Sequence, residues 1–154
     1  MTQTPIRAII AEDSDLSAEI QNGIQAVKRS DRQKLDREVS RSFADSLDLD
    51  GTFQSTDPDD RRWDYLIGHK TSGKVIAVEI HDANENQVDA VIAKRRAAES
   101  HLRDHLIEGA RISKWLWVAT GRVKLPTNTG KALRLKNAGI EFVGGALLPK
   151  HLPQ

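Results

Sequence analysis

The chain has 154 residues, and its 23 basic and 22 acidic residues leave a formal net charge of +1. This length fits one domain with a core that needs no covalent staple. The absence of cysteine excludes disulfides and thiolate metal ligands, and it favours a reducing, cytoplasmic compartment. No apolar run approaches the roughly 20 residues of a membrane helix, and residues 1–11 are too weakly apolar for a signal peptide. We therefore expect a single cytoplasmic domain (residues 1–154) without membrane contact.

Residues 1–30 are predicted to form an N-terminal helical extension. Ser14 and Asp15 form a plausible cap region, and the apolar residues after them recur at helical spacing. These apolar residues are Leu16, Ile20, Ile24 and Val27.

A second helical pattern runs from Leu35 to Leu47, with an apolar residue at every fourth position, and Gly51 closes it. The two patterns predict either two helices or one bent helix, broken near residues 29–31. Polar residues dominate 52–60, which predicts a loop with a short strand around Phe53.

Two segments, Trp63–His69 and Lys74–His81, predict strands, and the short connection between them ends in Gly73, as hairpins prefer. Further elements are expected at 85–108 (helix), 114–120 (strand), 128–137 (helix) and 140–145 (strand). Alternation of helices and strands late in the chain implies parallel pairing there, whereas the hairpin is antiparallel. The predicted fold class is α/β, with a mixed β-sheet that contains a central antiparallel hairpin and is flanked by helices.

The hairpin brings two acids together. If the turn is centred between Thr71 and Ser72, Asp64 lies directly opposite Glu79, and their Cβ atoms are about 5 Å apart on one face. His81 is two residues beyond Glu79 and shares that face. The other face is uniformly apolar, so we expect it to point into the core.

Two opposed carboxylates repel each other unless a cation or a proton lies between them. Mg²⁺ suits such a pair, because it takes one or two carboxylates and completes its shell with waters and substrate phosphate. Such an ion can activate a water and stabilise charge on a phosphodiester. A one-residue slip of register would separate the acids, and two solvated acids at the end of a hairpin are the alternative.

Asp64 before a turn and Glu79-Ile80-His81 after it resemble the motif of the PD-(D/E)XK nuclease superfamily. The order of elements is also similar, with a helix before the hairpin and a long helix and a strand after it. The resemblance implies a restriction-endonuclease-like core over residues 35–148, followed by a polar tail at 149–154. It further implies Mg²⁺- or Mn²⁺-dependent cleavage of nucleic acid, of DNA more than of RNA.

The resemblance assigns roles to individual residues. Asp64 matches the first acid of the family and Glu79 the second, and the backbone carbonyl of Ile80 matches a further metal ligand. The helix before the hairpin often carries another acid, for which Glu38 is the candidate. Two other acids, Asp36 and Asp45, compete with Glu38 for this role.

His81 stands where the family motif has its lysine, which positions or deprotonates the attacking water. A histidine can accept a proton near neutral pH. Some family members carry the lysine on the following helix, and Lys94 is the candidate for that position. Lys94 is also readily interpreted as a solvated helix residue. Gln87 lies early in the same helix, where it could face the acids, and the alternative is an ordinary polar residue of the first helical turn.

Three functions remain open from the sequence. The first is a metal-dependent nuclease with a nucleic-acid partner and, as in many such nucleases, a possible homodimer. The second is a catalytically inactive protein of the same fold that binds or regulates a protein partner, which the histidine in the motif favours. The third is a plain structural domain in which Glu79 pairs with His81 or with a nearby arginine.

A group of basic residues follows the strand at 114–120 and could contact a phosphate backbone. Its members are Arg122, Lys124, Lys131, Arg134 and Lys136. The alternative is a basic helix that is simply solvated.

Overall fold

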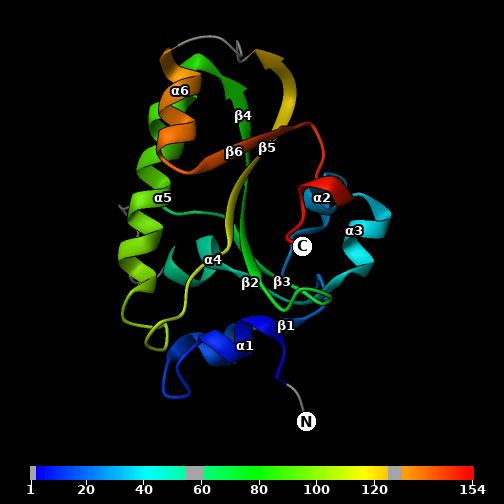
Figure 1. Ribbon diagram of the computed structural model, residues 1–154, viewed down its shortest axis with the longest axis vertical. Coiled ribbons are helices and arrows are strands. Elements are labelled where there is room, and N and C mark those ends of the chain that lie inside the picture. The colour runs from blue at the N-terminus through cyan, green and yellow to red at the C-terminus, as the bar shows by residue number, and fades with distance from the viewer. Residues whose placement is uncertain (1–2, 55–60, 125–129) are drawn as a thin grey trace.

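A mixed six-stranded sheet forms the centre of the protein (Figure 1), and its strands follow in the order β1-β2-β3-β4-β5-β6. The computed structural model describes residues 3–54, 61–124 and 130–154. The strands are β1 (Gln21–Asn22), β2 (Phe43–Asp48), β3 (Tyr65–His69), β4 (Val75–Asn84), β5 (Lys114–Lys124) and β6 (Ile140–Gly144). Neighbouring strands from β1 to β4 pair antiparallel, and β5 pairs parallel with both β4 and β6. The predicted mixed sheet with a central hairpin is therefore confirmed.

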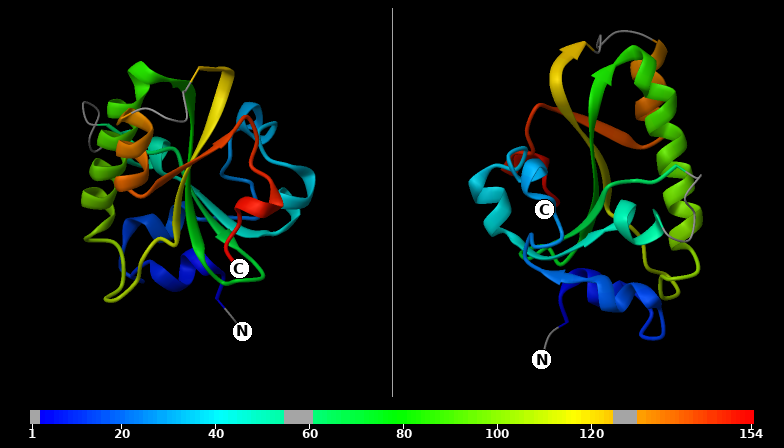
Figure 2. Two further views of the ribbon diagram at one scale, coloured as in Figure 1. Left: turned by 45° about the horizontal axis from the view of Figure 1, so that its top comes forward. Right: turned by 180° about the vertical axis from the view of Figure 1, so that it is seen from behind.

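Helices cover both faces of the sheet (Figure 2), with α4, α5 and α6 on one side and α2 and α3 on the other. The helices are α1 (Pro5–Ile9), α2 (Arg29–Arg32), α3 (Arg37–Arg41), α4 (Leu49–Gln54), α5 (Val88–Leu102) and α6 (Gly130–Asn137). Short 3₁₀ helices span Asp15–Glu19, Glu85–Gln87 and Pro149–His151. None of the helices within the described ranges combines the length and hydropathy that crossing a bilayer requires.

Alternation along the strands divides the apolar residues into two cores. On β3 and β4, Leu66 and Ala77 face the α5 side, whereas Ile67 and Ile76 face the side of α3. β5 is apolar on both faces, and Trp117 and Leu116 are fully buried in opposite cores. A doubly covered central strand is the expected position for such a segment.

The helix predicted over Leu35–Leu47 is only partly present. α3 ends at Arg41, and Phe43–Asp48 forms β2, which pairs with β3. A spacing of four residues fits the period of a strand as well as that of a helix, so the apolar pattern did not decide between them. The strand expected around Phe53 is also wrong, because Phe53 lies in α4.

The predicted N-terminal helix is replaced by shorter elements. Gly23 has a φ of 55°, a left-handed conformation that ends regular structure there, and residues 21–22 form β1. Leu16 is nevertheless almost fully buried, as its apolar pattern predicted.

The far end of α5 and the C-terminus also differ from the prediction. α5 ends at Leu102 and not near residue 108, because Leu106 leaves the helix and forms an isolated bridge with Ile10. Residues 149–154, predicted as a polar tail, include a 3₁₀ helix, and Leu152 packs against the core on the side of α3.

Candidate active site

The hairpin of β3 and β4 has the predicted register, with Tyr65 opposite Val78 and Leu66 opposite Ala77. Asp64 directly precedes β3 and therefore lies across from Glu79. The backbone N–H of Asp64 donates to Glu79 Oε1 at 3.1 Å, and the backbone N–H of Ile80 donates to Asp64 Oδ2 at 2.9 Å. Each acid is thus held by the backbone next to the other, which fixes both carboxylates in one place.

Glu79 has no solvent-exposed surface, and this excludes the alternative of two solvated acids. Its side chain lies on the α5 side of the sheet, because Leu66 and Ala77 of the same hairpin face that side. A carboxylate that loses its water shell in this way needs a partner of opposite charge or a proton.

Lys94 on α5 supplies that partner. Its Nζ lies 2.6 Å from Glu79 Oε2, and its side chain is 22% exposed. One ammonium therefore faces two carboxylates, and the repulsion expected between the acids is only partly offset. Lys94 is not a solvated helix residue, although sequence reasoning left that alternative open.

Burial controls the proton affinity of both acids. Desolvation, followed by the charge of Asp64, raises the pKa of Glu79 to about 8, against the opposing effect of Lys94. Desolvation also raises the pKa of Asp64, although the hydrogen bond from Ile80 and the charge of Lys94 act in the other direction. At neutral pH the carboxyl group of Glu79 therefore largely keeps its proton, and a further cation would stabilise the ionised forms of both acids.

His81 joins the same group through its side chain and its backbone. Its Nδ1 lies 3.8 Å from Glu79 Oε2, and its Nε2 lies 2.7 Å from Gln87 Oε1. Its carbonyl oxygen accepts a hydrogen bond of 3.0 Å from Trp117 Nε1. Gln87, expected to be an ordinary polar residue, therefore contacts the Nε2 side of the imidazole, while the Nδ1 side is the one near Glu79.

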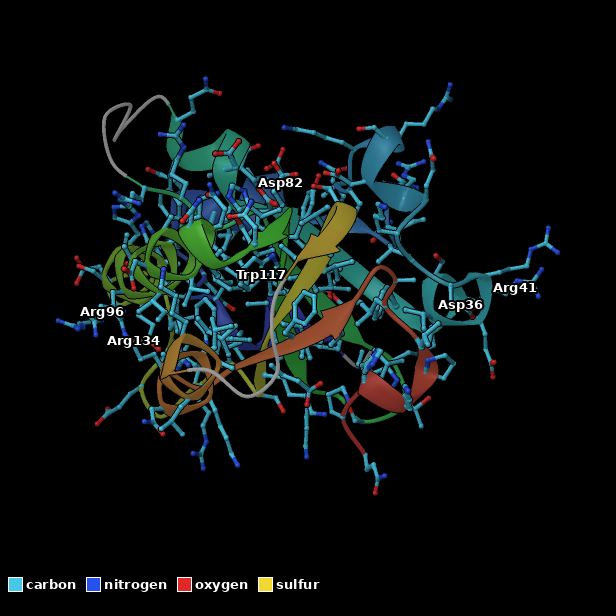
Figure 3. The ribbon with its side chains drawn as sticks, turned by 90° about the horizontal axis from the view of Figure 1, so that it is seen from above. Asp36, Arg41, Asp82, Arg96, Trp117 and Arg134 are labelled. Atoms are coloured by element: carbon cyan, nitrogen blue, oxygen red, sulfur yellow. The ribbon has the colours of Figure 1, made fainter. Side chains whose placement is uncertain are left out.

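Glu38 is not brought to the two acids. It is exposed on α3, and its neighbour Val39 packs into the core on the opposite face of the sheet from Glu79. Figure 3 shows Arg41 of the same helix and Asp36, which caps it, on the outer side, away from Trp117 at the centre. Asp45, the other competing acid, is fully buried and accepts a hydrogen bond from the backbone N–H of Ile6 at 3.0 Å.

Two acids that sequence reasoning did not select affect the site. The charges of Asp31 and Asp50 act on Asp64 and raise its pKa further. Asp50 on α4 lies 2.9 Å from Arg62 Nε, and Asp31 accepts a hydrogen bond from the Tyr65 hydroxyl. No local pattern distinguishes them, since Asp31 on α2 and Asp50 on α4 both come from elements outside the hairpin.

The donor atoms suit a hard divalent ion of the magnesium type. Asp64 and Glu79 offer carboxylate oxygens with an excess of negative charge, and Ile80 between Glu79 and His81 carries the carbonyl proposed as a further donor. Within residues 3–54, 61–124 and 130–154, no three His, Asp or Glu side chains form a metal-binding group. Waters and substrate oxygens would have to complete the shell, which Mg²⁺ tolerates and a structural Zn²⁺ site does not.

Three members of the basic group, Lys131, Arg134 and Lys136, lie on α6, which packs beside α5. Arg134 Nη2 lies 2.6 Å from Asp89 Oδ1 of α5. Arg134 and Arg96 point outward on the same side of the protein (Figure 3), so this face carries exposed positive charge. The side chains of Arg122 and Lys124 lie outside the described part of the chain.

No protein-family model matches the chain, and no curated protein or solved structure matches it significantly.

Proposed function

We propose that this chain is a metal-dependent nuclease that hydrolyses phosphodiester bonds, with DNA preferred to RNA. The observation that supports the proposal is the joint placement of Asp64, Glu79 and Lys94, with the ammonium 2.6 Å from a carboxylate that has no exposed surface. The order of these residues along the chain resembles that of the PD-(D/E)XK superfamily, with the lysine contributed by the helix after the hairpin. Because Lys94 can take over the role of the motif lysine, the position of that lysine in the motif can be occupied by His81.

Asp64, Glu79 and the carbonyl of Ile80 would hold a Mg²⁺ or Mn²⁺ ion, which supplies Lewis acidity toward a phosphoryl oxygen and its attacking water. Lys94 offsets the negative charge of Glu79 and would also stabilise the charge of a phosphate bound at the ion. His81 is oriented by Gln87 and can accept a proton from the attacking water. The backbone hydrogen bonds of Asp64 and Ile80 keep both acids in place throughout.

One observation favours the second function, an inactive protein of this fold that binds or regulates another protein. Both oxygens of Glu79 already have partners, one in Lys94 Nζ and one in the backbone N–H of Asp64. If Lys94 keeps its ion pair under all conditions, an ion at Glu79 has to share a carboxylate oxygen with one of these donors. Metal binding therefore separates the two functions directly.

The first experiment is isothermal titration of the protein with MgCl₂ and with MnCl₂. Wild type is compared with Asp64→Asn and Glu79→Gln, each of which replaces an ionisable carboxyl group by a neutral amide of nearly the same shape. Asp104→Asn and Glu108→Gln are the matched controls, because both residues are exposed and lie outside the site. Circular dichroism verifies that every variant is folded.

The nuclease proposal requires binding in wild type and in both controls, and its loss in both site variants. Binding should be accompanied by release of protons, because burial raises the pKa of Glu79 to about 8 and the ion displaces its proton. Plasmid DNA is then incubated with each metal, and cleavage should follow the same pattern across the variants. A folded wild type that binds neither ion and cleaves neither DNA nor RNA would refute the nuclease proposal and favour the second function, binding of a protein partner.

A further inference from the structure

Two adjoining hollows flank the segment 111–113, which leads into β5. The first has a volume of about 350 Å³ and lies between this segment and the second half of α5. The second has a volume of about 450 Å³ and lies between the same segment, the hairpin turn at Gly73 and Ile9 of α1. Arg111 and Ile112 line both hollows, so the two together form one groove, which we call the Arg111 groove.

Backbone hydrogen bonds fix the walls of the Arg111 groove. The N–H of Ile107 donates to the carbonyl of Ile9 at 2.9 Å, and the N–H of Ser113 donates to the carbonyl of Val75 at 2.8 Å. In Figure 1 the connection from α5 to β5 runs at the lower left, next to α1. The connection is therefore tied to α1 on one side and to β4 on the other, and the groove is a preformed feature of the fold.

The groove gathers incompletely buried apolar side chains. Ile9, Leu106 and Ile112 are partly buried and pack on the outside of the main core. Ile107 beside them is 46% exposed, and among the described residues only Leu133 is a comparably exposed large apolar side chain. These side chains give the groove an accessible apolar component that a bound molecule would cover.

The charges of the groove leave one cation without a partner. Arg95 lies over the Trp115 ring at 5.0 Å and bonds to Glu99 Oε1 at 2.9 Å, so these two charges neutralise each other. Lys74 Nζ donates to the carbonyl of Gln154. The exposed side chain of Arg111, in contrast, has no hydrogen bond or ion pair with any part of the chain that the structure describes.

From this arrangement we infer that the Arg111 groove binds an extended acidic peptide segment of a partner protein. The guanidinium of Arg111 lies between two hollows that each have apolar side chains in their walls, Leu106 in the first and Ile9 in the second. This arrangement is complementary to a carboxylate with aliphatic side chains on either side of it. In an extended chain, alternate residues point to the same face, so the aliphatic residues stand two positions before and two positions after the acid. Arg111 pairs with the acid, and the hollows on its two sides take the aliphatic side chains.

The groove shares no residue with the candidate active site. Lys94 of α5 faces Glu79, whereas the groove uses Arg95, Glu99 and Leu102 on another side of that helix. Peptide binding thus leaves the surroundings of both acids unchanged, and the inference does not depend on the proposed hydrolysis.

The test is selection from a displayed library of random linear peptides on the wild-type protein, with counter-selection on Arg111→Glu. Enriched peptides are synthesised with a fluorescent label, and their affinities are measured by polarisation. Arg103→Glu is the matched control, since it reverses an exposed charge in the same connection but outside the groove. Thermal unfolding establishes that both variants are folded, which is expected because each side chain is exposed.

The expected peptides carry one Asp or Glu with aliphatic residues two positions away on each side. Their affinity should fall by about tenfold or more in Arg111→Glu and stay within about twofold in Arg103→Glu. Replacing the peptide acid by its amide should weaken binding to wild type but not to Arg111→Glu. The inference is overturned if no peptide is enriched, if enriched peptides lack the acid, or if Arg111→Glu binds them as well as wild type. A DNA oligonucleotide that displaces the peptide from wild type but not from Arg111→Glu would also overturn it, in favour of a nucleic-acid site.

Discussion

Replacing Lys94 by methionine tests how the buried acid is stabilised. The change keeps most of the length of the side chain but removes the only ammonium within 2.6 Å of Glu79 Oε2, among the residues described. Breaking a buried ion pair by removing one partner typically costs about 3–5 kcal/mol. Glu79 can escape part of this cost by taking up a proton, because burial already raises its pKa to about 8. The loss of unfolding free energy should therefore be about 2–4 kcal/mol at about pH 9 and about 1 kcal/mol at about pH 6.

Urea unfolding followed by tryptophan fluorescence measures this loss. Trp63 and Trp117 are fully buried and Trp115 is 5% exposed, so unfolding changes the surroundings of all three. A double-mutant cycle of Lys94→Met with Glu79→Gln isolates the interaction between the two side chains. The coupling free energy should be about 2 kcal/mol at about pH 9 and should approach zero at about pH 6. Arg96→Met, on the exposed side of the same helix, should cost less than about 0.5 kcal/mol. A coupling that is small at about pH 9, or that does not change with pH, would refute the argument.

Three further outcomes are expected. Burial raises the pKa of Glu79 from its ordinary 4.5 to about 8. At a pH between these two values the folded state keeps a proton on Glu79 that the unfolded state has lost, so the free energy of unfolding falls as the pH rises. Between pH 6.5 and 8 the unfolding free energy should fall by up to about 1 kcal/mol per pH unit in urea titrations, and Glu79→Gln should remove most of that slope. Gly68→Ala should lower the free energy of unfolding by about 2–4 kcal/mol, because the added Cβ would lie 1.9 Å from Asp45 Oδ1. Asp45 accepts the backbone hydrogen bond that caps α1, so its displacement would also weaken that cap. A loss below about 0.5 kcal/mol would contradict the close approach. Tyr65→Phe should cost about 1–2 kcal/mol in the same assay, since its hydroxyl donates to Asp31 Oδ2 at 2.5 Å; an unchanged midpoint would show that this hydrogen bond contributes nothing.

The hairpin was predictable because its signals are local. The connection ending in Gly73 fixes the turn, the β-branched residues fix the strands, and the apolar face fixes the register. A register set in this way also placed Asp64 beside Glu79, since both belong to the same short stretch of chain. To predict the position of Lys94, one must also know that the face of α5 that carries it packs on the hairpin. The sequence could only propose this placement from the family resemblance.

The misassigned elements depend on long-range contacts. β2 exists because residues 43–48 pair with β3, and their four-residue apolar spacing is compatible with either type of element. Asp45 on this strand is fully buried because it caps α1, which lies about forty positions earlier in the chain. α5 ends early because Leu106 pairs with Ile10 near the start of the chain. Each of these outcomes follows from tertiary partners that no sequence window of one helix or strand contains.

The ion pair between Lys94 and Glu79 bears on how the protein matures. A cluster of bare carboxylates would make folding dependent on the supply of metal, as in small domains that are unfolded without their ion. Here an internal ammonium takes the place of the counter-ion while the polypeptide acquires its shape. Synthesis in metal-depleted cells, or purification in the presence of a chelator, should therefore yield folded protein, which under the proposed function would take up its ion afterwards.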